Sequence, residues 1–120
     1  KKLEKIKIDI KGREFLINNF YDGIAKLEFN QLCNTNIGAE DYIKIADTCS
    51  FIVIQNIPYF NDENANQQQR FITLIDILYE KKISIMISMA TRLENIGSSK
   101  KLFLPFKRTL SRIFELTAPK

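Results

Sequence analysis

Apolar and polar residues alternate at the start of the chain, and this two-residue period predicts β-strands. Isoleucine stands at every second position near the end of the segment 4–10, and a Lys-Gly pair then predicts a tight turn. The alternation resumes in a second strand, and an Asp-Gly pair predicts another turn before a third strand over 24–29. We therefore expect residues 1–29 to form an antiparallel meander.

Two apolar runs flank an amphipathic segment in the second half of the chain. The runs "FIVIQNIP" and "ISIMISMA" are typical of central strands that are buried on both faces of a sheet. Between them, after the polar loop "YFNDENANQQQ", apolar residues recur at helical spacing and predict a long helix: Phe71, Leu74, Ile75 and Leu78. A strand, a crossover helix and a strand predict a parallel unit.

Two further helices complete the predicted fold. "AEDYIKIADTC" begins with acidic residues, which suit the positive end of a helix, and "PFKRTLSRIFELTA" has Pro105 near its first turn. The predicted class is mixed α/β. We expect residues 1–120 to be one domain, with the β-meander over 1–29 and the α/β part over 39–120.

Composition narrows the class of protein. The chain has 120 residues, 45% of them hydrophobic, and a net charge of +4, which suits a globular domain. A basic excess can attract nucleic acid, acidic lipid or an acidic protein, or it can simply be a solvated surface. No aromatic residues interleave with the basic runs, so we expect no specific nucleic-acid partner.

The cysteines and the ends of the chain bear on location. Cys33 and Cys49 are the only cysteines, and we expect both to be reduced and buried in an intracellular protein. The expected location is the cytoplasm of a prokaryote, with a peripheral membrane location, or the mitochondrion of a eukaryote, as alternatives. No apolar run is long enough to predict a transmembrane segment, and no signal peptide is evident. The first residue is Lys rather than Met, so the chain is expected to be a piece of a longer one.

Much catalytic chemistry is excluded by residue type and spacing. The chain has no histidine, so we predict neither a zinc site nor a His-containing triad. None of the four glycines is placed to make a phosphate-binding loop, although "GSSK" at 97–100 is similar to the end of one. After "FIVIQ", where two acids would hold magnesium, the chain has Asn56-Ile57-Pro58. We expect no cofactor and no metal in the chain itself.

Three carboxylates and three arginines remain as candidates. We expect Asp41, Asp76 and Glu80 to be charges on helix surfaces. Arg108 and Arg112 stand four residues apart and share one helix face. Arginine can neutralise a phosphoryl transition state, so both are candidate catalytic residues, as phosphate-sensing or finger arginines, and Arg70 is a weaker one. The alternative is that they form ion pairs or helix-end contacts that stabilise the fold.

Taken in order, these segments resemble the C-terminal part of the ZapE-like ATPases, which are P-loop proteins related to the AAA+ class. The family pattern runs F-x-F-x-x-L-C, G-x-x-D-Y-x-x-I-A, an apolar strand ending in proline, R-R-F-I-x-L-I-D-x-L-Y, an apolar strand with S-A, and R-x-x-S-R-L-x-E-M. The chain matches it in order at Phe29, Leu32, Cys33, Gly38, Asp41, Tyr42, Ile45, Ala46, Pro58, Arg70, Phe71, Ile72, Leu74, Ile75, Asp76, Leu78, Tyr79, Ser88, Arg108, Ser111, Arg112 and Glu115. It departs from the pattern at Leu27, Gln69, Met89 and Leu116.

The resemblance implies an ATPase whose Walker A and Walker B motifs lie upstream, so that ATP and Mg are cofactors of the intact parent chain. It implies an upstream P-loop domain as a partner in the same chain. It also implies a role in cell division, with the tubulin-like division protein as a partner, or in mitochondrial protein quality control. Two other hypotheses remain: a stand-alone interaction module that docks a protein through its edge strands or basic loops, and, more weakly, a basic nucleic-acid-binding domain.

Overall fold

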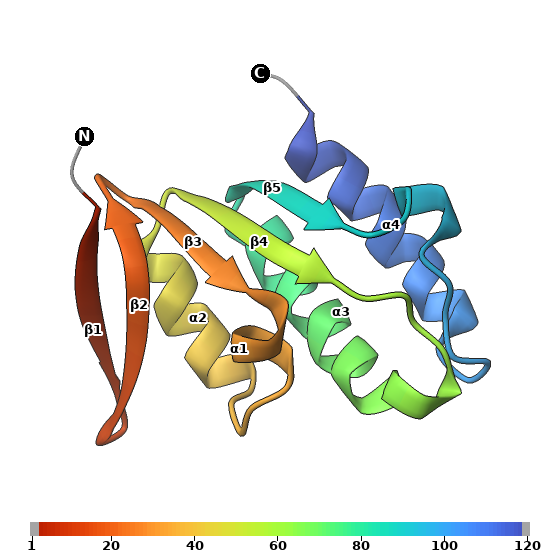
Figure 1. The fold of residues 1–120 in the computed structure, drawn as a ribbon, viewed down its shortest axis with the longest axis horizontal. Helices are drawn as coiled ribbons and strands as arrows, with labels where there is room; N and C mark the ends of the chain where they lie inside the picture. The colour runs from red at the N-terminus through yellow and green to blue at the C-terminus, as the bar shows by residue number, and fades with distance from the viewer. Residues whose placement is uncertain (1–2, 119–120) are drawn as a thin grey trace.

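The alternating and apolar segments pair into one five-stranded sheet, with strand order β1-β2-β3-β4-β5 (Figure 1). The computed structural model describes residues 3–118. The strands are β1 (Glu4–Ile10), β2 (Arg13–Tyr21), β3 (Ile24–Glu28), β4 (Phe51–Ile57) and β5 (Ser84–Met89). The helices are α1 (Phe29–Cys33), α2 (Ala39–Thr48), α3 (Ala65–Glu80) and α4 (Phe103–Thr117), with short 3-10 turns at Asp62–Asn64 and Leu93–Asn95. The predicted mixed α/β class is confirmed.

The antiparallel meander is confirmed in strands β1, β2 and β3. Lys11 and Gly12 both have a positive φ, as a tight hairpin turn requires, and the Asp9 carboxylate accepts the Gly12 N–H at 3.1 Å. Between Ile17 and Phe20, strand β2 has one residue more than its partner strand, which is a β-bulge. Since a bulge shifts the alternation by one residue, both of these apolar side chains can face the core.

The parallel unit is also confirmed, because β3, β4 and β5 run parallel and α3 connects β4 to β5. Two expectations about burial were wrong. Strand β5 lies at the edge of the sheet rather than at its centre. Strand β4 is buried on one face only: Ile52 and Ile54 are buried, whereas Phe51 and Val53 on the other face are half-buried. The physical reason is that the helices of the described part of the chain cover just one face of the sheet.

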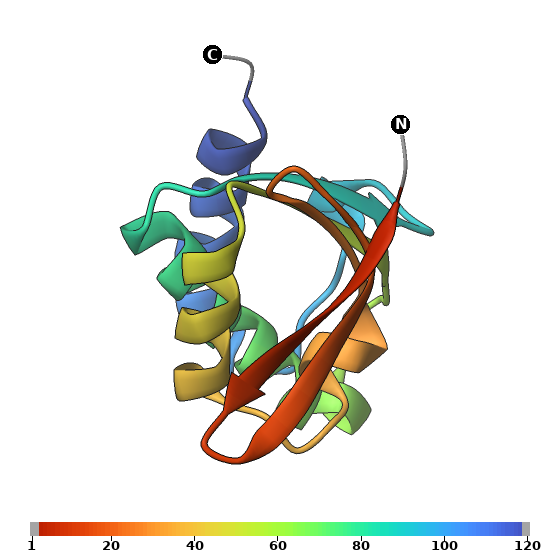
Figure 2. The ribbon, with the colours of Figure 1, turned by 90° about the vertical axis from the view of Figure 1, so that its left-hand side faces the viewer.

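Figure 2 shows this layer, with α2, α3 and α4 all on the same side of the sheet. The predicted apolar stripe of α3 is confirmed, since the four residues that define it are fully buried: Phe71, Leu74, Ile75 and Leu78. The helix begins at Ala65, so the polar loop before it is shorter than expected. The Asn61 side chain accepts the Glu63 N–H at 2.8 Å and so starts the helical run early.

Four phenylalanines pack between the sheet and the helices at one end of the core. Phe60 lies at the centre of this cluster, with ring centroids 5.7 Å from Phe29, 5.6 Å from Phe71 and 5.5 Å from Phe106. All four rings are buried. Aromatic pairs at these separations add to the free energy of burial, so the cluster ties α1, α3 and α4 to the chain that leaves β4.

Part of the basic excess, Lys1, Lys2 and Lys120, lies outside the described residues. No helix within residues 3–118 combines the length and the apolar character that crossing a membrane would require.

Candidate functional site

The carboxyl ends of parallel strands are where α/β proteins usually bind ligands, and here they carry a closed polar cluster. Strand β4 has an extra residue between Ile54 and Ile57, and Asn56 adopts a φ of 61° in that bulge. The Asn56 side chain donates to Glu28 at 2.7 Å, and its N–H donates to the Ser88 hydroxyl at 3.1 Å. The position where an acidic pair would hold magnesium thus joins the ends of three strands.

The "GSSK" segment is occupied by contacts within the chain. The Ser99 N–H donates to the Gln68 side chain at 2.9 Å, and the Lys100 N–H donates to the Asp62 carboxylate at 2.8 Å. The Gln68 amide also donates to the Ser98 hydroxyl at 2.8 Å. A phosphate loop needs N–H groups that are free to point at the phosphate, and these two are already paired. The residues present therefore do not fit a bound ATP with its magnesium.

Arg112 is held between α3 and α4. Its guanidinium lies 2.5 Å from the Asp76 carboxylate and 4.6 Å from the centre of the Tyr79 ring. The Tyr79 hydroxyl in turn donates to Glu115 at 3.0 Å, and this hydrogen bond raises the pKa of Tyr79. A planar guanidinium can pair with a carboxylate and stack on a ring at once, so Arg112 fastens α4 onto α3.

Arg108 lies one turn earlier on α4 and is exposed. Within residues 3–118 no carboxylate lies within ion-pairing distance of it. The two arginines thus share a helix but differ in their surroundings. Arg108 can reach a group outside this chain without breaking a contact, whereas Arg112 would first have to leave Asp76.

Arg70 lies in the second turn of α3 rather than at its start. Its guanidinium donates to the carbonyl oxygens of Cys33, at 3.3 Å, and Thr35, at 2.8 Å. The last carbonyls of a helix have no partner within it, so Arg70 caps α1. The contact joins segments more than thirty residues apart.

The three candidate carboxylates differ in burial. Asp41 was expected on a helix surface, and this is wrong: it is buried, and it accepts hydrogen bonds from Arg13 and from the Gly38 N–H, each at 2.7 Å. This ion pair attaches the β1–β2 hairpin to α2. Asp76 is half-buried beside Arg112, and Glu80 is exposed. Within the described part of the chain, no three His, Cys, Asp or Glu side chains come together in a way that could hold a metal ion.

Both cysteines are free and buried, as expected. Burial raises the pKa of Cys33 to about 12 and that of Cys49 to about 11. A thiol reacts as the thiolate, so both are inert near neutral pH.

Sequence reasoning missed Gln68, the Arg13–Asp41 pair and the Tyr79–Glu115 bond. Gln68 falls in the polar loop predicted before the long helix. The one available signal was its position three residues before Phe71, which continues the apolar stripe by one turn, and a buried amide needs partners. The other two contacts join residues far apart in the sequence and leave no local pattern.

Comparisons with known proteins agree on one family. The family model described as AFG1-like ATPase matches residues 1–120. Lactation elevated protein 1 homolog B of Danio rerio is 34% identical over 80 residues, which are 67% of this chain and 16% of that protein. Cell division protein ZapE of Escherichia coli is 27% identical over 90 residues, which are 75% of this chain and 24% of that protein. The matched segment thus spans less than a quarter of either relative. No solved structure matches significantly.

Proposed function

The chain belongs to the AFG1-like ATPase family, and we propose that it is the C-terminal module of such an ATPase, in which the rest of the polypeptide binds and hydrolyses ATP. The observation that carries the proposal is the match of the family model to all 120 residues. The paired N–H groups of Ser99 and Lys100 support it, because they leave this module no phosphate-binding loop of its own.

ATP and Mg are then cofactors of the intact ATPase, held by its P-loop domain. The module supplies packing and, through α4, an arginine. Arg108 is the residue proposed to meet the phosphates, since it is exposed and no described carboxylate competes for it. Arg112 is proposed to position α4 through its contacts with Asp76 and Tyr79. An arginine supplied from a second element stabilises the negative charge that develops during phosphoryl transfer.

The setting proposed for the intact protein is cell division, in the cytoplasm. The name of the Escherichia coli relative supports it, and the tubulin-like division protein is the partner that the family resemblance implies. Co-sedimentation of the intact ATPase with polymers of that protein tests the partner. Recovery of the ATPase in the polymer pellet supports it, whereas equal recovery with and without polymer refutes it.

Steady-state ATP hydrolysis by the intact protein tests the proposed function. Arg108→Ala is expected to lower turnover by about 10³-fold or more, the effect of removing a finger arginine. Lys107→Ala is the matched control, because it removes one positive charge from the neighbouring exposed position of the same helix. It should leave turnover unchanged.

Two results would count against this account. An intact protein with no magnesium-dependent ATP hydrolysis would refute the function. Turnover of Arg108→Ala within about twofold of the unsubstituted protein would refute the role of Arg108 alone.

A further inference from the structure

Within residues 3–118, one face of the sheet has no helix over it. Figure 1 shows β3, β4 and β5 in front of the helices, and Figure 2 shows the same arrangement from the side. The side chains that point away from the helices include Ile24, Phe51, Val53 and Met86, which we call the open sheet surface. Ile24 is 42% exposed and Met86 is 57% exposed, while Phe51 and Val53 are half-buried. Lys26 lies in the same row as Val53 and Met86. Glu28 and Gln55 form the next row on this face, so the apolar part of the surface ends there.

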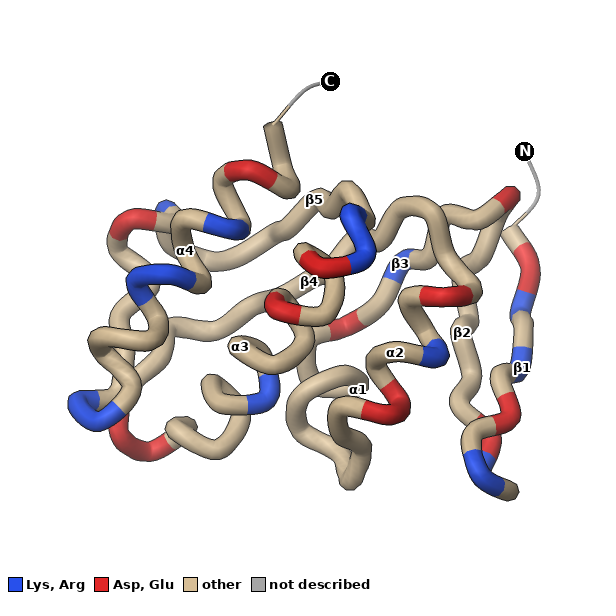
Figure 3. The backbone as a smooth tube through the Cα atoms, turned by 180° about the vertical axis from the view of Figure 1, so that it is seen from behind, with Lys and Arg blue, Asp and Glu red and all other residues tan. Residues whose placement is uncertain are grey.

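The helix layer differs from the open sheet surface in its charge. Lys and Arg are interspersed with Asp and Glu along α2, α3 and α4, whereas β4 and β5 carry no charged residue (Figure 3). A charged layer is suited to contact with water. An apolar face that joins several strands is typical of an interface.

The two edges of the sheet differ in the same way. Strand β1 carries Glu4, Lys5, Lys7 and Asp9, and charges of this kind keep an edge strand from pairing with another chain. Strand β5, "SIMISM", has no charge and no proline, and its Met86 is a large exposed apolar side chain. Its outer backbone groups have no strand partner within residues 3–118. One edge is therefore protected against pairing and the other is not.

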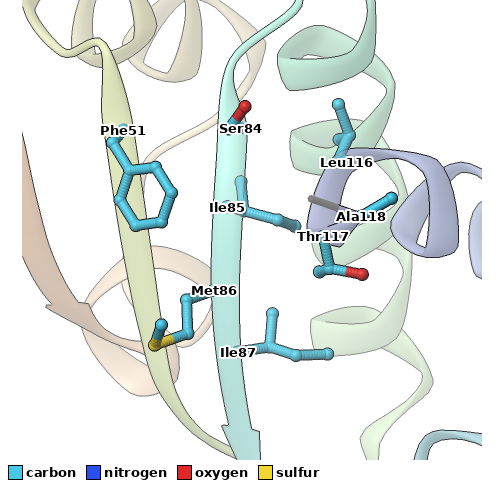
Figure 4. Close-up of a pocket in the computed structure, with 8 residues that line it drawn as sticks. All are labelled: Phe51, Ser84, Ile85, Met86, Ile87, Leu116, Thr117 and Ala118. Atoms are coloured by element: carbon cyan, nitrogen blue, oxygen red, sulfur yellow. The ribbon is translucent and has the colours of Figure 1, made fainter. Parts of the chain in front are cut away.

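A groove of about 440 Å³ runs along the unprotected edge. Figure 4 shows its two walls: Ser84, Ile85 and Met86 from β5, and Leu116 and Thr117 from the end of α4. Extended segments bind such edges by adding a strand to the sheet, with side chains entering the groove beside it. The groove and the open sheet surface meet at Met86, so one partner can cover both.

We propose that this combined surface binds the nucleotide-binding part of the same polypeptide, which pairs a strand with β5 and covers the open sheet surface. The inference rests on the proposed function. The matched segment spans less than a quarter of either curated relative, so the intact ATPase has a large partner tethered to this module. Tethering gives an effective concentration in the millimolar range, far above that of a second copy.

The buried thiols make the surface testable by cysteine labelling. Cys33 and Cys49 are buried and have raised pKa values, so they contribute little background. The test variant is Met86→Cys in the intact ATPase. The matched control is Ile43→Cys on the outer side of α2, because Ile43 is another exposed apolar residue, at 42%. Each labelling rate is divided by the rate of the same variant in urea.

Met86→Cys is expected to react about tenfold more slowly than Ile43→Cys in the native intact protein, although residue 86 is the more exposed of the two in this chain. Equal rates would overturn the proposal. Slow labelling that becomes fast on dilution would also overturn it, because it would identify a second copy as the occupant. ATP hydrolysis is measured on the same sample. Protection at residue 86 without hydrolysis would refute the proposed function and leave this interface standing.

Discussion

The contact between Arg112 and Asp76 gives the sharpest test of how the last helix is held. Arg112→Ala removes both the ion pair with Asp76 and the stacking on Tyr79. Asp76→Ala removes the ion pair alone. The double variant closes a thermodynamic cycle, which isolates the energy of the pair from other effects of each substitution.

The exposure of the two side chains sets the magnitude. They are 24% and 34% exposed, so the pair lies between a surface ion pair and a buried one. Exposed pairs contribute about 0–1 kcal/mol, and breaking a buried pair costs about 3–5 kcal/mol. We therefore expect a coupling energy of about 1–2 kcal/mol. Stacking on an aromatic ring adds about 0.5–1 kcal/mol, so Arg112→Ala should cost about 1.5–3 kcal/mol in all.

Urea unfolding of the four proteins, followed by circular dichroism, measures these free energies. Arg112→Lys should lose less than Arg112→Ala, because lysine keeps the charge but has no plane to stack on Tyr79. Free energies that add to within about 0.3 kcal/mol would show that Arg112 and Asp76 do not interact. The idea that Arg112 fastens α4 onto α3 would then be refuted.

Three further predictions concern the core, one turn and the buried thiols. Phe60→Ala should lower the free energy of unfolding by about 3–5 kcal/mol, because it leaves a cavity among three other rings; a loss below about 1 kcal/mol in urea unfolding would contradict the packing. Gly97→Ala should cost at least about 1 kcal/mol more than Gly12→Ala, since both positions have positive φ but only at Gly97 would a Cβ lie 2.5 Å from the Phe60 carbonyl oxygen; equal losses would refute the clash. The free energy of unfolding should fall as the pH rises above 9, where thiols of ordinary pKa ionise in the unfolded chain while burial keeps the pKa of Cys33 at about 12 and that of Cys49 at about 11. The stabilisation is complete below pH 9 and each thiol removes up to about 1.4 kcal/mol per pH unit above it, so Cys33→Ala should flatten the slope between pH 9 and pH 10; an unchanged slope would show that Cys33 is not protected.

Local pattern was enough to predict the elements and their pairing. The helical spacing of Phe71, Leu74, Ile75 and Leu78 identified α3, because a single buried stripe leaves a periodic trace in the sequence. The turn residues at Gly12 fixed the first hairpin for the same reason. These features depend on neighbours along the chain, which the sequence displays directly.

Burial and tertiary contacts could not be predicted in this way. Apolar runs at Phe51 and Met86 indicated strands covered on both faces, yet residues 3–118 cover only one of them. In the proposed interface, the nucleotide-binding part of the intact ATPase covers the second face, so the apolar runs match the burial expected in the intact protein. The partners of Arg70 and Arg112 lie 35 or more residues away, and no local spacing reveals them.

The proposed ATPase module has no nucleotide site of its own. Titration calorimetry of magnesium-ATP, run in parallel on residues 1–120 and on the intact protein, tests this directly. We predict that the intact protein gives heat of binding and that the 120-residue chain gives none, since the Ser99 and Lys100 N–H groups are already paired in the module. Micromolar binding of magnesium-ATP to the 120-residue chain would contradict it.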